Sequence, residues 1–148
     1  MPHFTLTALP QSGPMLDMIV GASFPRILAL QAEGRIAPPV QKIRALLDTG
    51  ASCTCIDPTV LVALDLQPTG KTLMTTPSTG AIPVEADTYD VCIIIQPSGN
   101  QQPLMRAVIS VCASELVHQG YHALMGRDIL KDCYFTYNGS AKLFTLAY

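Results

Sequence analysis

The segment RALLDTGAS at residues 44–52 places an acidic side chain at the end of an apolar run. Residues 41–47 begin with alternating polar and apolar side chains and end fully apolar, which is typical of a strand that enters a hydrophobic core. Asp48 follows at once, and Thr49-Gly50 predicts a turn. Because burying an unpaired carboxylate is costly, this arrangement predicts a fold that needs the charge of Asp48 at that place.

The rest of the chain predicts a mostly β domain. Short apolar and β-branched runs between turn residues predict strands at 15–20, 41–47, 71–76, 81–86, 90–96, 104–111, 134–137 and 143–146. Asn138-Gly139 predicts a tight turn in a final hairpin. Pro77-Ser78-Thr79-Gly80 predicts the tip of an earlier hairpin, between residues 71–76 and 81–86.

Two short helices complete the predicted domain. Residues 57–64 predict the first, because Asp57 is a good N-cap and Pro58 fits the first turn. Residues 128–131 predict one or two further helical turns. Residues 1–14 are rich in Pro, Gly and Ser and predict a loose N-terminal arm, so the domain itself is expected at 15–148. Residues 21–39 give no definite prediction.

The composition restricts the possible partners. The 148 residues suffice for one domain. Only 14% are charged, against about 25% in an average domain, while 49% are hydrophobic. This combination suggests that part of the surface is hidden in an interface. The net charge of -2 and the scattered Lys and Arg argue against nucleic acid.

The sequence predicts a cytoplasmic protein without a membrane segment. The first residues lack the basic and apolar regions of a signal peptide, and no apolar run approaches the roughly 20 residues of a membrane span. Five cysteines, with no C-x-x-C pair, make a disulfide framework or zinc ribbon improbable. Reduced thiols in the cytosol are the simpler interpretation.

Several weaker motifs could carry other functions. Gly70-Lys71-Thr72 resembles the end of a phosphate-binding loop, but Pro68 interrupts it and a strand follows. His118 and His122 have a metal-ligand spacing, but Gly120 lies between them and no third ligand is evident. Cys53-Thr54-Cys55 could react or bind a metal, although two small buried side chains are the simpler interpretation. A Gly-x-Ser-x-Gly elbow is absent from the sequence.

Asp48-Thr49-Gly50 remains, with a plain turn as the competing interpretation. A surface turn would not need two leucines before it and Ala51 after it. A carboxylate that acts as a base must be held in place and partly desolvated. Thr49 could lock the loop through its hydroxyl group, and Gly50 would let the backbone approach closely enough to donate an N–H to the carboxylate.

Two motifs carry a resemblance to a known family. The sequence LLDTGAS at residues 46–52 resembles the active-site signature of aspartic peptidases. The sequence ALMGRDIL at residues 123–130 resembles the apolar-apolar-Gly-Arg-Asp segment of the retropepsin-like branch. From about residue 15 to about 133, the chain is similar to the single-lobed, stand-alone retropepsin-like proteases of bacteria, which are related to retroviral proteases.

The resemblance implies a closed β-barrel-like fold with a homodimeric active site. Asp48 would be the catalytic residue, with Thr49, Gly50, Ala51, Gly126, Arg127 and Asp128 in support. The mechanism needs two carboxylates that share one proton and hold one water. No other aspartate precedes Thr-Gly or Ser-Gly, so the second carboxylate would be Asp48 of another copy on a two-fold axis.

The resemblance also implies a substrate-covering flap and an aspartic endopeptidase that needs no metal or organic cofactor. Residues 75–82 would cover the substrate, with Thr76, Pro77, Ser78, Thr79, Gly80 and Ala81 as flap residues. The expected partners are a second copy of the chain and a peptide or protein substrate.

The sequence departs from the family in three places. Ser52 stands where many retroviral proteases carry an acid that pairs with the arginine of the Gly-Arg motif, so the partner of Arg127 stays open. The flap tip is less rich in glycine. After Cys133 a long hairpin replaces a short terminal strand, so the dimer interface could be built differently.

Two other functions are compatible with this sequence. One is a protease-like fold that serves as a peptide-binding or scaffolding module, since fold does not fix function. The other is an enzyme that acts only after processing of residues 1–14 or within a larger assembly.

Overall fold

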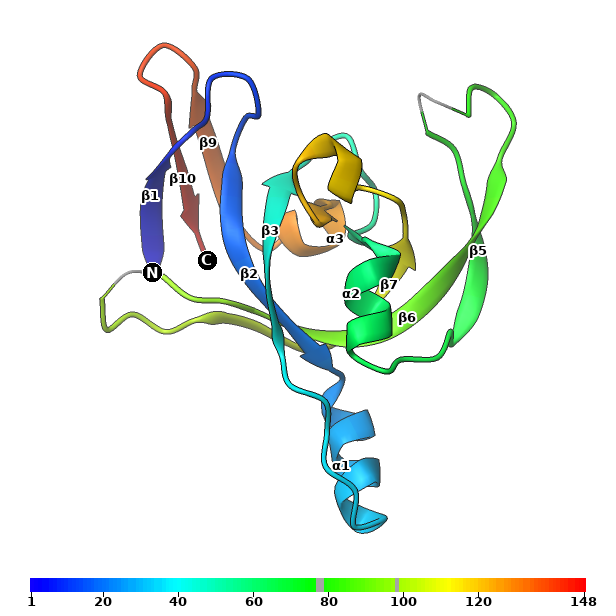
Figure 1. The fold of residues 1–148 in the computed structure, drawn as a ribbon. Coiled ribbons are helices and arrows are strands. Elements are labelled where there is room, and N and C mark those ends of the chain that lie inside the picture. Colours follow the sequence, from blue (N-terminus) through cyan, green and yellow to red (C-terminus); the bar gives the residue numbers. More distant parts are fainter. Residues whose placement is uncertain (77–78, 98) are drawn as a thin grey trace.

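A computed structural model describes residues 1–76, 79–97 and 99–148 (Figure 1). The elements follow one another as β1 (His3–Thr7), β2 (Met15–Ala22), α1 (Phe24–Ala32), β3 (Gln41–Leu47), β4 (Cys55–Ile56), α2 (Pro58–Ala63), β5 (Gly70–Met74), β6 (Val84–Ile95), β7 (Leu104–Ala113), the 3₁₀-helix η1 (Val117–Gln119), β8 (Ala123–Met125), α3 (Arg127–Leu130), β9 (Tyr134–Asn138) and β10 (Leu143–Ala147).

A closed barrel forms the body of the molecule (Figure 1). In the described part of the chain, the larger sheet has the order β2-β3-β8-β4-β7-β6-β5, and a further pairing of β2 with β6 closes its first six strands into a ring. β5 lies outside the ring and pairs antiparallel with the start of β6. The mostly β, closed-barrel fold predicted from the sequence is confirmed.

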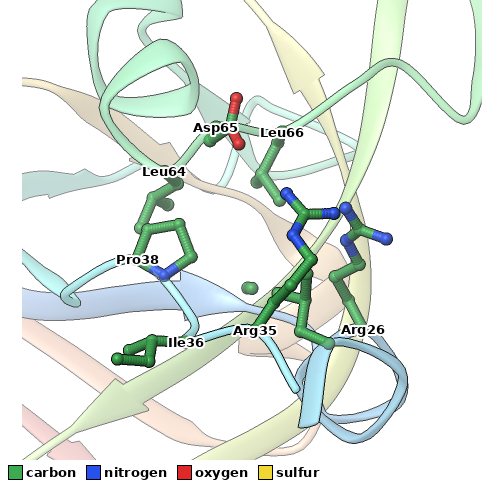
Figure 2. A pocket seen from close by; sticks show the side chains of 9 residues that line it. Arg26, Arg35, Ile36, Pro38, Leu64, Asp65 and Leu66 are labelled. Carbon is green, nitrogen blue, oxygen red and sulfur yellow. The ribbon is translucent and has the colours of Figure 1, made fainter. Parts of the chain in front are cut away.

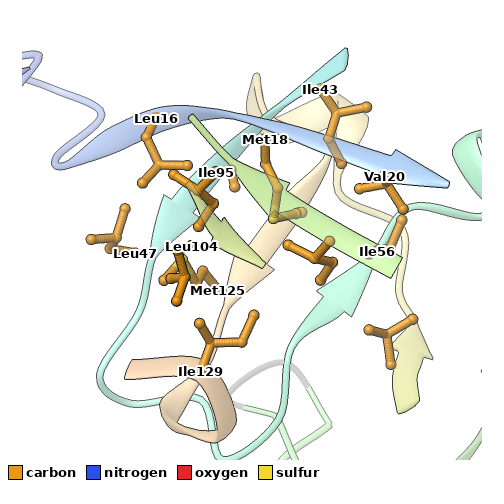
Figure 3. Close-up of a cluster of buried hydrophobic side chains, with 14 of the residues drawn as sticks. Leu16, Met18, Val20, Ile43, Leu47, Ile56, Ile95, Leu104, Met125 and Ile129 are labelled. Carbon is orange, nitrogen blue, oxygen red and sulfur yellow. The ribbon is translucent and has the colours of Figure 1, made fainter. Parts of the chain in front are cut away.

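The barrel is filled by the apolar side chains of alternating strand positions. Figure 3 shows Met18 and Val20 of β2, Leu47 of β3 and Met125 of β8 around a common interior, with Ile129 of α3 at its edge. Met18, Val20, Met125 and Ile129 are fully buried. Because β3 and β8 end in this core, the residues that follow them are held on a rigid base.

The N-terminal segment differs from the loose arm expected over residues 1–14. His3–Thr7 forms β1, which pairs antiparallel with β10, and β10 pairs with β9. Phe4 and Ala8 are buried, and the backbone N–H of Tyr148 donates to the carbonyl of Pro2 at 3.0 Å. The two ends of the chain therefore lie side by side in a small sheet next to the barrel (Figure 1).

Three further elements differ from the sequence-based expectations. The strands expected at 81–86 and 90–96 are one continuous strand, β6, with an irregular register between Val91 and Ile93. Residues 21–39 contain α1, which projects from the barrel (Figure 1). The two-residue strand β4 was not predicted. No helix in the described residues is long and apolar enough to cross a membrane.

Asp57 is the N-cap of α2, as the sequence predicted, and its carboxylate is buried. Asp57 is only 4% exposed. Its Oδ1 accepts from the backbone N–H and hydroxyl of Thr59, and its Oδ2 accepts from the N–H groups of Leu116 and Val117. Burial alone would raise the pKa of Asp57, but these hydrogen bonds outweigh it and hold the pKa below its ordinary value. Asp57 thus fixes α2 to the segment before η1.

We expect Asp57→Ala to lower the free energy of unfolding by about 2–4 kcal/mol at pH 7. The helix loses its N-cap, and the backbone N–H groups of Leu116 and Val117 lose their acceptor. Since folding lowers the pKa, the contribution is present above the unfolded-state pKa of about 3.9 and is lost as pH falls through the folded-state value. Urea unfolding should therefore show a smaller difference from the parent at pH 3. Asp17→Ala, at an exposed ion pair with Lys42, is the control with little expected effect. An equal loss at both pH values would contradict this account.

Candidate active site

Asp48 is positioned by the parallel pairing of β3 and β8. Leu47 lies opposite Met125 in this register, and the backbone N–H of Asp48 donates to the carbonyl of Met125 at 3.0 Å. Both neighbouring side chains are buried, so the chain emerges from the core at Asp48. The carboxylate is half-buried at the rim of the barrel.

The loop after Asp48 folds back onto its carboxylate. The backbone N–H of Gly50 donates to Oδ1 of Asp48 at 2.8 Å, and the N–H of Ala51 donates to the carbonyl of Asp48 at 3.2 Å. A Cβ atom at residue 50 would lie 3.0 Å from Oδ1, which is closer than a side chain comfortably allows. The close approach expected for Gly50 is therefore present.

Arg127 binds the same loop through three of the loop's backbone carbonyls. Its guanidinium donates to the carbonyl of Thr49 at 2.7 Å and to that of Gly50 at 3.2 Å. Its own N–H donates to the carbonyl of Ala51 at 2.9 Å. Residue 52 is an exposed serine, where many retroviral proteases carry an acid that pairs with this arginine. The three carbonyls are the partners of Arg127 that the sequence left open.

A buried hydroxyl group joins the two sequence motifs. Thr54 is fully buried, and its hydroxyl donates to Oδ1 of Asp128 at 2.7 Å and accepts from the N–H of Gly126 at 3.2 Å. The N–H of Thr54 donates to Oδ2 of Asp128 at 2.8 Å. Asp128 thus has both oxygens bound, as a structural carboxylate would.

The sequence did not indicate Thr54 as a site residue, and the hydroxyl that locks the loop was expected from Thr49. Thr49 is exposed and contributes its carbonyl, and the described residues hold no hydrogen bond to its side chain. Thr54 stands between two cysteines, in a segment whose sequence suggests only small buried side chains. A buried hydroxyl must find a hydrogen-bond partner, but the sequence does not show which residue provides it.

Gly126 brings the two loops into direct backbone contact. A Cβ atom on residue 126 would lie 2.5 Å from both the carbonyl carbon and the oxygen of Cys53, and 3.0 Å from the nitrogen of Thr54. These neighbours are main-chain atoms that cannot turn aside. The segment after Asp48 can therefore cross the start of α3 only where the side chain is hydrogen.

Tyr121 is a further residue near the carboxylate that the sequence did not indicate. Its side chain is 9% exposed, and its hydroxyl donates to Oε1 of Gln119. Burial, and after it the negative charge of Asp48, raises the pKa of this phenol. The phenol of Tyr121 thus stays uncharged and lies beside the site.

The hairpin that was expected to be the flap is formed by β5 and the first part of β6. Leu73 pairs with Glu85 and Met74 with Val84, the last pair of the hairpin. The backbone N–H groups of Thr79 and Gly80 donate to the carbonyl of Thr76 at 3.0 and 3.1 Å. Gly80 is left-handed with φ of 62°, and Ala81 follows in the turn. The other two expected flap residues, Pro77 and Ser78, lie outside the described residues.

Asp48 lines neither of the two main cavities. One, about 30 Å³ in volume, lies between α1 and the end of α2, where Arg26 and Arg35 approach Asp65 (Figure 2). The other, about 460 Å³, lies between β1 and β2 and includes Leu16 and Arg44.

The weaker motifs lie in ordinary structural positions. Lys71 is on β5 and forms an ion pair with Glu85, in a strand rather than a phosphate-binding loop. His118 lies in η1, and His122 accepts from the N–H of Arg44 at 3.5 Å through Nδ1. Within the described residues, no group of three His, Cys, Asp or Glu side chains is arranged to hold a metal ion.

Comparison with known proteins identifies the fold and the matched segment. A family model described as aspartyl protease matches residues 32–91, which include Asp48-Thr49-Gly50. Among solved structures, a retropepsin-like aspartic protease from Rickettsia conorii is similar with a TM-score of 0.56 at 15% identity, over 99% of this chain and 91% of that chain. The EIAV protease complexed with the inhibitor HBY-793 gives a TM-score of 0.46 at 17% identity, over 86% of this chain and 93% of that chain. No curated protein matches the chain significantly. The chain therefore has a retropepsin-like fold, and the segment that contains Asp48 matches the aspartyl protease family model.

Proposed function

We propose that the chain is an aspartic endopeptidase that works as a homodimer, with Asp48 of each subunit in one shared site. The observation that carries this proposal is the placement of Asp48. Its carboxylate stands at the end of a core strand, accepts from Gly50 N–H, and lies in a loop that Arg127 clamps. That is the arrangement of a positioned base, within a segment that matches an aspartyl protease family.

The exposed loop that follows Asp48 supports a second subunit in the site. One carboxylate cannot both take a proton from water and donate one to the scissile carbonyl, and no other Asp-Thr-Gly exists in the chain. Thr49 and Gly50 are exposed next to Asp48, so a two-fold axis at this place would bring two such loops together.

The proposed reaction is hydrolysis by an activated water. The ionised Asp48 takes a proton from the water as its oxygen bonds to the peptide carbonyl carbon. The protonated Asp48 of the other subunit gives its proton to the carbonyl oxygen. The tetrahedral intermediate then collapses, the C–N bond breaks, and the leaving nitrogen receives a proton from the dyad. No metal or organic cofactor is needed.

The β5–β6 hairpin is the proposed substrate cover. Leu73, Ile82 and Val84 on it are 70%, 74% and 50% exposed, an unusual amount of apolar surface for an unpartnered hairpin. An extended peptide between the hairpin and Asp48 would cover these side chains and receive backbone hydrogen bonds, as in strand addition.

We expect the chain to sediment as a dimer of about twice its 15.9 kDa mass at micromolar concentration. Because the active species would be the dimer, the rate of peptide cleavage per chain should fall as the protein is diluted below its dissociation constant. Sedimentation and cleavage measured over the same dilution series test this. A monomer that cleaves peptides at a constant rate per chain would refute the shared site, and peptide binding without turnover would instead favour a binding module.

A further inference from the structure

Three cysteine thiols come together beside the loop that carries Asp48. Cys55 of β4 lies opposite Cys112 of β7 in a parallel pairing. Cys53, two residues earlier, places its Sγ 3.3 Å from Sγ of Cys112. Leu116 and Tyr121 complete the same buried cluster. The function proposed above uses none of these thiols.

The three thiols differ in their access to solvent. Cys55 and Cys112 are 3% and 4% exposed, whereas Cys53 is half-buried. A small molecule therefore reaches Cys53 first, and Cys112 stands directly behind it. A half-buried sulfur with a buried sulfur behind it is the arrangement of an attacking and a resolving thiol.

We propose that Cys53 and Cys112 are a redox-active pair that closes to an intramolecular disulfide when it reacts with a small-molecule disulfide such as oxidised glutathione. In the first step the Cys53 sulfur loses its proton to solvent and attacks one glutathione sulfur, and one glutathione thiol leaves. In the second step the Cys112 sulfur attacks the Cys53 sulfur, and the second glutathione thiol leaves. The two cysteines are oxidised and one glutathione disulfide is reduced to two thiols.

The geometry requires only a small movement. A disulfide bond is about 2.05 Å long, so the two sulfurs must close by about 1.2 Å from their 3.3 Å separation. Cys53 lies in the loop before β4, where the backbone has more freedom than within a strand. Cys55 is fixed by strand pairing, and its thiol is directed to the carbonyl of Cys53 at 3.8 Å, so it is the less suitable partner.

The chemistry of the two thiols suits an ordered reaction. Contacts with the thiols of Cys55 and Cys53 lower the pKa of Cys112 against the effect of burial, which favours attack by the Cys112 sulfur in the second step. Burial and the contact with Cys112 raise the pKa of Cys53 to about 11. We therefore expect the first step to be slow at neutral pH and the second to follow quickly.

The disulfide would tether the catalytic loop to the barrel. Cys53 follows Asp48 by five residues, and its carbonyl packs on Gly126. The bond would also close a loop between positions 59 residues apart, which restricts the unfolded chain and stabilises the folded one. Oxidation would thus make the segment that follows Asp48 more rigid.

The test uses the full-length protein, reduced and then incubated with oxidised glutathione. We expect the intact mass to fall by two hydrogen atoms, peptide mapping to join Cys53 to Cys112, the melting temperature to rise, and a dithiol to reverse all three. Cys53→Ser should lose this product while keeping the melting temperature of the reduced parent. Cys133→Ser, at a half-buried thiol that points to the carbonyl of Ile129, should form it normally.

Three results would overturn the proposal. The first is a glutathione adduct on Cys53 that persists without closing. The second is a disulfide between Cys55 and Cys112. The third is closure in Cys53→Ser to the same extent as in the parent. Each readout is a mass or a melting temperature, so the test is independent of whether the chain cleaves peptides.

Discussion

Replacing Asp48 by Asn should abolish peptide cleavage and leave the protein folded. Asn is nearly isosteric and can still accept from the N–H of Gly50, but it cannot take a proton from water. Loss of the acid–base step lowers the rate by at least about 10²–10⁴-fold. Removing two like charges from the proposed two-fold axis should leave the dimer at least as stable. Cleavage of a peptide library by parent and variant, with circular dichroism and sedimentation, measures each part.

A matched control separates this effect from a general loss of charge. Asp65→Asn changes an exposed aspartate just after α2, outside the loop of Asp48. Residue 65 has a left-handed conformation with φ of 50°, which Asn tolerates well. It should cleave as the parent does. Full activity in Asp48→Asn would show that Asp48 is not the catalyst, and the peptide-binding module would become the better account.

Mixing parent and Asp48→Asn chains tests the shared site directly. If each site needs one Asp48 from each subunit, a mixed dimer is inactive. After subunit exchange at equal amounts, the activity of the parent chains should fall to about half, since random pairing leaves half of them in mixed dimers. Undiminished activity would mean that one subunit suffices.

The proposed dyad also fixes the form of the pH dependence. One Asp48 must be ionised and the other protonated, so cleavage should fall on both sides of an optimum on the acid side of neutrality. The two limbs belong to the pair and not to either residue. A rate that stays constant well above neutral pH would contradict the shared proton.

Local signals explain which elements could be predicted from the sequence. Strand β3 has the predicted bounds because its pattern changes from alternating to apolar where it enters the core. Helix α2 begins as predicted because Asp57 and Pro58 act on their own turn. The β9–β10 hairpin is present as predicted, but Asn138 is the last residue of β9 and residues 139–142 connect the strands in place of a two-residue Asn-Gly turn. Each of these depends on neighbouring residues only.

Elements held by distant partners could not be predicted. β1 pairs Phe4 with Leu146 at the other end of the chain, whereas the Pro, Gly and Ser residues of segment 1–14 suggested a loop. Helix α1 was not predicted, although Ser23 and Pro25 stand at its N-cap and in its first turn. At the site, Asp48 and Gly50 followed from the motif, while the role of Thr54 depends on Asp128, which is 74 positions away.

Gly126→Val should unfold the protein or destabilise it severely. The first added atom, Cβ, would lie 2.5 Å from the backbone carbonyl of Cys53, and relief requires moving the loop that carries Asp48 or the start of α3. That movement would also break the hydrogen bond from Gly126 N–H to the buried Thr54 hydroxyl. We expect a loss of at least about 3 kcal/mol in the free energy of unfolding, measured by urea denaturation.

Two companion variants separate the steric effect from a general cost of replacing glycine. Gly126→Ala adds only the Cβ atom and should already lose most of this stability, because that atom makes the collision. Gly139→Val lies at an exposed turn where the nearest neighbour, a side-chain carbon of Tyr137, is 3.7 Å away, and should fold nearly as the parent does. If Gly126→Val kept the parent's melting temperature and sedimented as the parent does, the contact between Gly126 and Cys53 could not be what fixes the loop of Asp48. The loop of Asp48 would then have to be held by its hydrogen bonds, among them those of Gly50, Arg127 and Asp128.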